Sequence, residues 1–145
     1  MIAGIGTDLT RIGRIQKSLE KPGFLERVFG PQERALLRAA PRRAERAAAN
    51  FAAKEAFGKA LGTGLMREFS PCEAEALRDG RGAPYFAFSG RAAALMRARG
   101  LRAHLSLTHE GEYAAAFVVL EYADDGANAV RPRHSGAGDA KACRE

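Results

Sequence analysis

A glutamate and a lysine stand one helical turn apart in FAAKEAFGKALGTG, residues 51–64, among residues that are otherwise small or apolar. Ala, Phe, Lys and Glu favour helix, and the two late glycines suit a C-terminal cap. On a helical wheel, Glu55 and Lys59 share a face with small and apolar residues, which predicts that this face is turned inward. A buried carboxylate costs free energy unless it is paired or holds a cation, so Glu55 requires a partner.

Two partners are available to Glu55. The first is Lys59, because Glu before Lys at i, i+4 is the favoured order for an ion pair on a helix. The second is Asp8, at the predicted end of the first strand, with a divalent cation between the two carboxylates. Mg²⁺ takes one or two protein carboxylates and fills its other positions with water and phosphate oxygens. Lys59 would then be free to meet a phosphate, and Gly62 and Gly64 could let the backbone approach one closely. The residues alone leave both alternatives open.

A second group of polar residues surrounds the predicted last hairpin and consists of Ser106, Thr108, His109 and Glu110. A histidine at a strand end is often only a hydrogen-bonded surface residue, and this alternative stays open for His109. A zinc site is not predicted, because no Cys or His lies at ligand spacing around His109.

The elements that must position these residues can be read from hydrophobic periodicity. We expect a strand over 2–8, helices over 10–20, 24–29, 30–40 and 42–62, two strands joined by a DGRG turn, a helix over 89–100, and strands over 101–109 and 113–122. The last strand, YAAAFVVLEY, is so apolar that burial on both faces is predicted. This order indicates an α+β domain over residues 1–123. Residues 124–145 hold one large aliphatic residue and are predicted to form a disordered tail.

The net charge of +6 is confined to the first part of the chain, since residues 1–59 hold 12 Lys/Arg against 6 Asp/Glu. Such an excess points to an acidic partner, which composition alone cannot identify. A basic, non-enzymatic module that binds nucleic acid is one alternative. It explains the charge but not an inward Glu55, and aromatic residues are not interleaved with the basic ones. No apolar run is long enough to cross a membrane and the N-terminus does not resemble a signal peptide, so a cytoplasmic location without membrane contact is expected.

Four segments together resemble one family: GIGTDL, FAAKEAFGKALGTG, DGRGAPYF and LSLTHEGEYAAAFVVLE. Their order and approximate spacing are similar to those of the holo-(acyl-carrier-protein) synthases, the small bacterial 4′-phosphopantetheinyl transferases, over residues 1 to about 123. The resemblance implies Mg²⁺-dependent transfer of 4′-phosphopantetheine from coenzyme A to a serine of apo acyl carrier protein, giving holo carrier for fatty-acid synthesis. It implies the α+β fold of these transferases, packed as a homotrimer, and no nucleic acid partner.

The resemblance also assigns roles to individual residues. Asp8 and Glu55 match the metal-binding pair and, with Lys59, form the implied catalytic set. The implied coenzyme A site contains Lys59, Gly62, Gly64, Ser106, Thr108 and His109. The acidic carrier is expected to dock on the exposed side of the first helix, at Arg11, Arg14 and Lys17. The chain departs from the family where Thr108 precedes the histidine in place of the frequent serine, and where Phe51 stands at a position that is often tryptophan. The group that removes the serine proton stays open between Glu55, Glu110 and a metal-ordered water.

Overall fold

The computed structural model describes residues 1–64 and 67–123. Its elements run in the order β1 Ile2–Arg11, α1 Ile12–Leu19, α2 Phe24–Val28, α3 Pro31–Ala39, α4 Arg43–Ala60, a 3₁₀ turn η1 Pro71–Glu73, β2 Ala74–Arg78, β3 Pro84–Phe88, α5 Gly90–Ala98, β4 Leu101–Glu110 and β5 Tyr113–Tyr122. The α+β class and the predicted order are confirmed, while η1 was not predicted. The predicted tail, residues 124–145, lies outside the described residues.

Strand β1 is longer than predicted, and this changes the place of Asp8. Its antiparallel pairing with β5 continues to Arg11, which lies opposite Tyr113. Asp8 therefore lies inside the strand, and the first helix begins at Ile12. The prediction that Asp8 ends the strand is wrong because pairing with β5 outweighs the helical pattern of the residues that follow.

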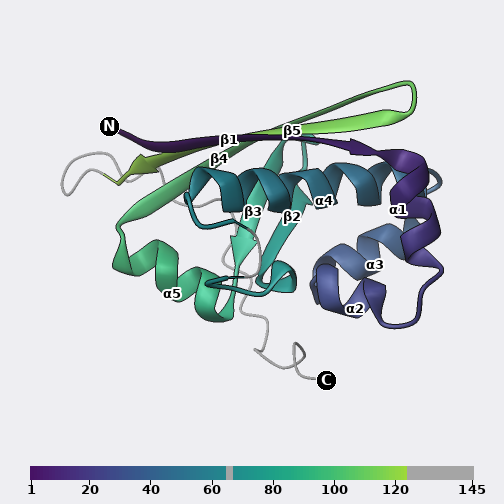
Figure 1. The fold of residues 1–145 in the computed structure, drawn as a ribbon, viewed down its shortest axis with the longest axis horizontal. Helices are drawn as coiled ribbons and strands as arrows, with labels where there is room; N and C mark the ends of the chain where they lie inside the picture. The colour runs from purple at the N-terminus through teal and green to yellow at the C-terminus, as the bar shows by residue number, and fades with distance from the viewer. Residues whose placement is uncertain (65–66, 124–145) are drawn as a thin grey trace.

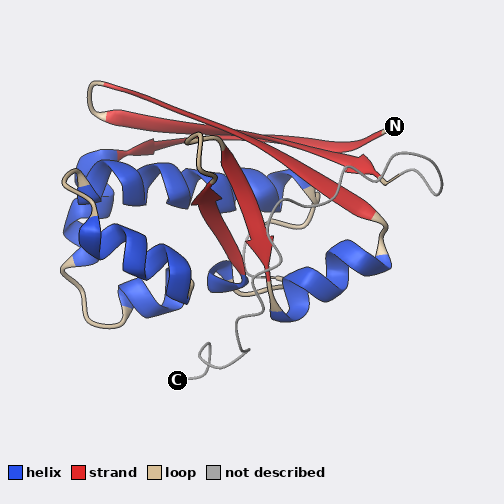
Figure 2. Ribbon diagram, turned by 180° about the vertical axis from the view of Figure 1, so that it is seen from behind, coloured by secondary structure: helices blue, strands red, loops and turns tan. Residues whose placement is uncertain are grey.

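The long strands form one antiparallel sheet in the order β1-β5-β4, and β2 pairs with β3 in a separate hairpin. Helix α4 lies along one face of the long sheet, with α1, α2 and α3 gathered near one end and α5 near the other (Figures 1 and 2). This places the FAAKEAFGKA segment of α4 directly beneath β1 and β5. None of the helices in the described part of the chain is long and apolar enough to span a bilayer.

Small residues allow α4 to lie close against β1. A side chain at Gly4 or Gly6 would collide with the carbonyl oxygens of Ala60 and Ala56, respectively. Ala56 itself is completely buried. Below α4, Phe57 packs on Phe86 and Phe88 of β3, with ring centroids 5.3 and 4.9 Å away. The sequence GIG thus holds the strand that carries Asp8 against the helix that carries Glu55.

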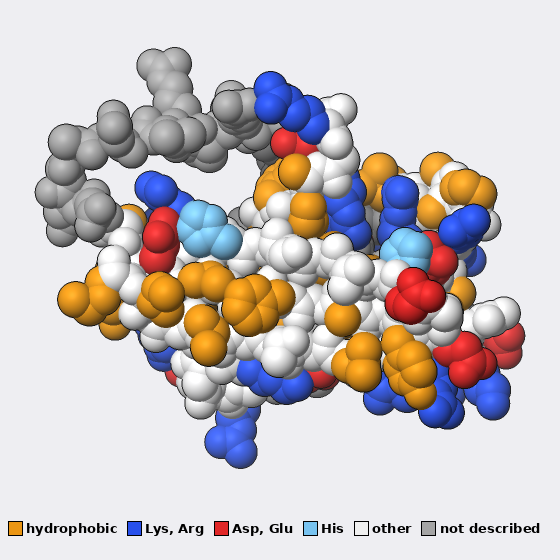
Figure 3. All heavy atoms as spheres, turned by 90° about the horizontal axis from the view of Figure 1, so that it is seen from above, with side chains coloured by type: hydrophobic (Ala, Val, Ile, Leu, Met, Phe, Trp, Pro, Cys, Tyr) orange, Lys and Arg blue, Asp and Glu red, His pale blue; other side chains and the backbone are white. Residues whose placement is uncertain are grey.

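Strand β5 is buried on one face only in the single chain, so the prediction of burial on both faces is not met within one chain. Ala114, Ala116, Val118 and Leu120 are buried toward α4, whereas Phe117 is 47% exposed. The opposite face, here called the outer sheet face, carries the exposed side chains Ile5, Leu9, Tyr113 and Phe117. Figure 3 looks onto this face and shows hydrophobic side chains gathered over it. Residues 1–64 and 67–123 leave these side chains exposed.

Candidate active site

Asp8 projects from β1 toward α4, because it lies opposite Ala116, which is buried on that side. Lys59 Nζ of α4 lies 2.9 Å from Asp8 Oδ1 and donates a hydrogen bond to the Thr7 carbonyl oxygen, also at 2.9 Å. The buried Thr10 hydroxyl donates to Asp8 Oδ2 at 2.8 Å. The Asp8 side chain is 15% exposed and that of Lys59 is 53% exposed. Asp8 is thus held firmly, while its lysine partner remains open to a ligand.

Glu55 lies half-buried on α4, one turn before Lys59. Burial raises its pKa, and the charge of Asp8 raises it further, while Lys59 and Arg14 act in the opposite direction. Among the ion pairs of residues 1–64 and 67–123, Lys59 is paired with Asp8 and not with Glu55. The first alternative from the sequence is therefore not what the structure has. The face is also less buried than the helical wheel predicts.

The donor set around Asp8 and Glu55 fits a hard divalent cation. Two carboxylates close enough to raise a pKa by mutual repulsion are an arrangement that a cation relieves. Groups of three or more potential metal ligands are absent from the described part of the chain. A two-carboxylate set suits Mg²⁺, which retains several waters and takes phosphate oxygens from a substrate. A cation here would share Asp8 with Lys59.

The predicted residues of β4 separate onto two faces of the sheet. Ser106 and Thr108 lie opposite Phe117 and Ala115, and both are exposed on the outer side. His109 lies opposite the buried Ala114 and thus turns toward α4. Its Nε2 is 3.3 Å from Glu45 Oε1. The structure therefore does not bring Ser106 together with Asp8 within one chain.

His109 and Thr108 line a cavity of about 350 Å³, here called the basic pocket. Its charged and polar lining consists of Arg42, Glu45, Arg46, Arg78, Thr108 and His109. Asp8, Glu55 and Lys59 are not part of this lining. The three arginines were missed at the sequence level, where only a general basic excess over the first 59 residues was visible. No sequence feature pointed to Arg78, because it lies beyond that basic region and beside a turn motif.

Gly62 and Gly64 close the C-terminal end of α4. Their φ angles are +77° and +75°, in the region that favours glycine. The Gly62 and Gly64 amides donate to the carbonyl oxygens of Lys59 and Gly58. The structure thus accounts for both glycines as a helix cap. Their contact with a phosphate remains a prediction.

The three residues predicted to dock the carrier are all exposed, but they come from two elements. Arg11 belongs to β1, not to the first helix, and donates to the Tyr113 hydroxyl at 3.0 Å. Arg14 and Lys17 belong to α1. The Arg14 guanidinium lies 5.3 Å from the centroid of the Phe51 ring. Arg14 also acts on the pKa of Glu55, so α1 brings positive charge to the edge of the candidate site.

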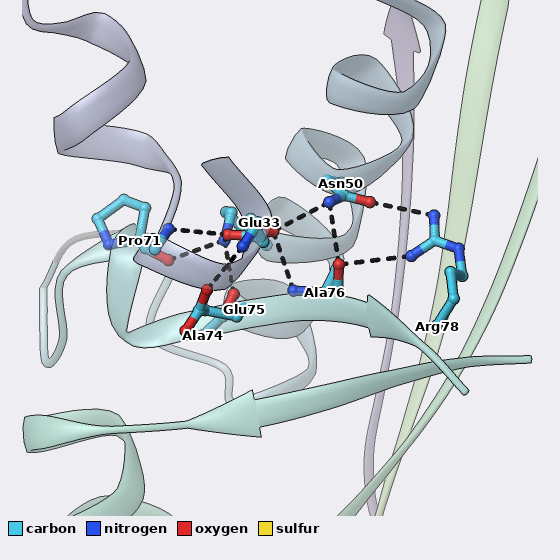
Figure 4. Close-up of polar contacts among 9 residues, drawn as sticks. Glu33, Asn50, Pro71, Ala74, Glu75, Ala76 and Arg78 are labelled. Atoms are coloured by element: carbon cyan, nitrogen blue, oxygen red, sulfur yellow. Dashed lines mark hydrogen bonds and ion pairs between the residues drawn. The ribbon is translucent and has the colours of Figure 1, made fainter. Parts of the chain in front are cut away.

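A buried polar network lies behind Glu55 and was not predicted. Lys54 Nζ, completely buried, is 2.7 Å from Glu33 Oε2 of α3 and donates to the carbonyl oxygens of Pro71 and Ala74. Glu33 Oε1 accepts from the Asn50 side chain and from the Ala76 amide. Figure 4 shows Glu33 at the centre of these contacts. The network joins α3, α4, η1 and β2 and holds the helix segment that presents Glu55.

The chain is similar to known proteins in both sequence and structure. A family model described as the 4′-phosphopantetheinyl transferase superfamily matches residues 4–118. The holo-[acyl-carrier-protein] synthase of Myxococcus xanthus is 47% identical over 127 residues, covering 86% of this chain and 98% of the relative. That of Aromatoleum aromaticum is 43% identical over 123 residues, covering 83% and 98%.

Solved structures agree with these relatives. The chain resembles the crystal structure of holo-[acyl-carrier-protein] synthase from Neisseria meningitidis with a TM-score of 0.78 and 34% identity, covering 83% of this chain and 99% of the other. It resembles the Bacillus anthracis synthase, solved in complex with coenzyme A (3′,5′-ADP), with a TM-score of 0.73 and 38% identity over 85% and 99%. The matched region contains both β1 and α4, which carry the candidate site. The chain therefore belongs to the 4′-phosphopantetheinyl transferase superfamily.

Proposed function

We propose that this chain is a holo-[acyl-carrier-protein] synthase, which transfers 4′-phosphopantetheine from coenzyme A to a serine of apo acyl carrier protein and so supplies holo carrier for fatty-acid synthesis. The observation that carries this proposal is the arrangement of Asp8, Glu55 and Lys59 where β1 crosses α4. The alignments with relatives named for this activity span nearly the full length of each relative. One related structure was solved in complex with coenzyme A.

The reaction forms one phosphorus–oxygen bond and breaks another. The serine hydroxyl oxygen of the carrier forms a bond to the phosphorus that bears pantetheine, and the bond from that phosphorus to the bridging oxygen breaks. 3′,5′-ADP leaves with the electron pair, and the hydroxyl proton passes to a base. Glu55 and a metal-ordered water are two candidates for this base. Glu110, at the end of β4, is the other candidate side chain.

Breaking the pyrophosphate requires positive groups that neutralise the negative charge on its oxygens. Asp8 and Glu55 are the residues that would hold Mg²⁺, which when bound neutralises charge on the phosphate oxygens. Lys59, half-exposed beside Asp8, is placed to meet a phosphate oxygen as well. The basic pocket, with Thr108 and His109, offers a second anionic subsite for the donor. Exposed Arg14 and Lys17 on α1 are placed to dock an acidic carrier near the site.

We further infer a homotrimer from the outer sheet face. Exposed apolar side chains on one sheet face call for a covering surface, and a second copy of the chain would provide one. Three head-to-tail contacts would close into a ring. Ser106 and Thr108 lie on the outer side of the sheet. Assembly would therefore place them at or near a subunit interface, and a neighbouring chain could complete the donor site.

The proposal is tested by intact-mass measurement of an apo acyl carrier protein after incubation with coenzyme A and Mg²⁺. The carrier should gain one phosphopantetheine with the wild-type chain, and chelation of divalent cations should stop the gain. Asp8→Ala and Glu55→Ala should abolish transfer while the far-UV spectrum stays unchanged. Glu20→Ala, an exposed acidic change just after α1, is the matched control and should remain active. An unmodified carrier with the wild-type chain, or full activity in either site variant, would contradict the proposal.

The alternative of a non-enzymatic nucleic-acid-binding module has less support. It accounts for the basic excess but assigns no role to the carboxylate pair or to Lys59. Such binding would weaken steeply with salt and would not require Mg²⁺. Measuring nucleic-acid binding by the wild-type chain at low and high salt, without Mg²⁺, tests this alternative.

A further inference from the structure

Arg78 is a half-buried guanidinium that lacks a carboxylate partner within residues 1–64 and 67–123. Burial lowers the pKa of Arg78, the neighbouring charge of Arg46 lowers it further, and the charge of Glu33 acts in the opposite direction. The repulsion between these two neighbouring cations is unfavourable in the empty chain, and a bound anion would reduce it.

The guanidinium of Arg78 is nevertheless held in one orientation. Its Nη2 donates to Asn50 Oδ1 at 3.1 Å, and its Nη1 donates to the carbonyl oxygens of Leu77 and Ala76 at 3.2 and 3.4 Å. Asn50 is 2% exposed, and its amide nitrogen donates to Glu33 Oε1 and to the Ala76 carbonyl oxygen. Figure 4 shows Arg78 beyond Asn50, at the end of the network that starts at Glu33. The network fixes the arginine before any ligand arrives.

Arg78 borders the basic pocket together with Arg42, Arg46 and His109. The carboxylate in the lining, Glu45, lies 3.8 Å from Arg42 and 3.3 Å from His109 and is not ion-paired with Arg78. The pocket therefore keeps Arg78 and Arg46 for a ligand. A rigid guanidinium fork matches the oxygens of a phosphate group, and orientation in advance lowers the entropy cost of binding.

We propose that Arg78 binds a phosphate group of the coenzyme A donor and that Asn50 is the residue that positions it. This inference rests on the proposed function and names a binding residue beyond those expected from the sequence. Coenzyme A offers two kinds of phosphate, the 3′-monoester and the pyrophosphate. The pocket chemistry suits either, and the donor lacking the 3′-phosphate distinguishes them.

The experiment measures binding by calorimetry, with coenzyme A and 3′-dephospho-coenzyme A as the probes and without carrier or turnover. Arg78→Met removes the charge and keeps the length of the side chain. It should raise the Kd for coenzyme A by about 10- to 100-fold, the range for losing a charge-assisted hydrogen bond. If Arg78 holds the 3′-phosphate, the Kd for the dephospho donor should stay unchanged. If it holds the pyrophosphate, both Kd values should rise alike. Arg81→Met, an exposed arginine in the adjacent turn, is the control and should bind both donors as wild type does.

Asn50 is tested through its coupling to Arg78. Asn50→Ala should raise the Kd for coenzyme A in the wild-type background and should add nothing in the Arg78→Met background. A merely structural role would weaken binding equally in both backgrounds. Arg78→Gln serves if Arg78→Met does not fold, because its amide can still donate to Asn50. Wild-type affinity for both donors in the folded Arg78 variant would overturn the inference while leaving transfer intact. A wild-type chain that binds no coenzyme A would instead overturn the proposed function.

Discussion

Two lysines five residues apart on α4 have opposite surroundings and opposite tasks. Lys54 is completely buried against Glu33, whereas the Lys59 side chain is 53% exposed beside Asp8. Burial raises the pKa of Glu33 and lowers the pKa of Lys54, and their mutual attraction acts against both shifts. All three hydrogens of the Lys54 ammonium have acceptors. Lys54 thus stabilises the fold, whereas Lys59 keeps an exposed ammonium group that fits the phosphate contact proposed above.

The buried pair leads to a prediction about stability. Lys54→Met should lower the free energy of unfolding by about 3–5 kcal/mol, because it leaves a charged carboxylate buried without its partner. Glu33→Leu combined with Lys54→Met should lower it by less than the sum of the two single changes. Urea denaturation of the three variants measures this. Strictly additive losses would mean that the two charges do not depend on each other.

At the scale of elements, the contact between β1 and α4 decides how the site is assembled. Gly6 faces the Ala56 carbonyl oxygen so closely that an added methyl group would overlap it. Gly6→Ala should therefore force the strand away from the helix and cost at least about 1–3 kcal/mol of stability. Transfer activity should fall as well, since Asp8 is carried two residues further along the same strand. Gly13→Ala is the control, because nothing lies within 4 Å of the position of its added methyl group. Equal melting temperatures for both variants would contradict this account.

Most elements were predictable because each has a clear hydrophobic period, and Glu55 and Lys59 stood out as polar residues on an otherwise small and apolar helix face. What could not be predicted depends on contacts between distant segments. The extension of β1 to Arg11 requires its partner Tyr113. Glu33 and Lys54, which pair across two helices, are 21 residues apart in sequence. Arg78 becomes a candidate only when β2 is placed beside α4. A local sequence pattern cannot show contacts between segments that are so far apart in the chain.

At the scale of the whole molecule, the outer sheet face explains why the last strand reads as buried on both sides. Four apolar side chains on this face are 38–66% exposed in the single chain: Tyr113 and Phe117 of β5, and Ile5 and Leu9 of β1. Isolated exposed apolar residues are normal, but several on one sheet face indicate an interface. The homotrimer proposed above would supply the second cover that the apolar sequence of β5 predicts.

The assembly prediction follows from this surface. Light scattering should give three times the chain mass of 15.5 kDa. Leu9→Glu places a charge on the 66%-exposed side chain of the outer sheet face and should shift the chain toward monomer, because burying an unpaired charge in an interface is costly. Leu36→Glu, on a 40%-exposed leucine of α3 away from this face, is the matched control and should remain trimeric. If neighbouring chains complete the site, Leu9→Glu should lose transfer with its fold intact, and mixing Asp8→Ala with His109→Ala chains should restore some activity. A fully active wild-type monomer would refute the assembly, whereas a trimer without complementation would place Asp8 and His109 in the site of one subunit.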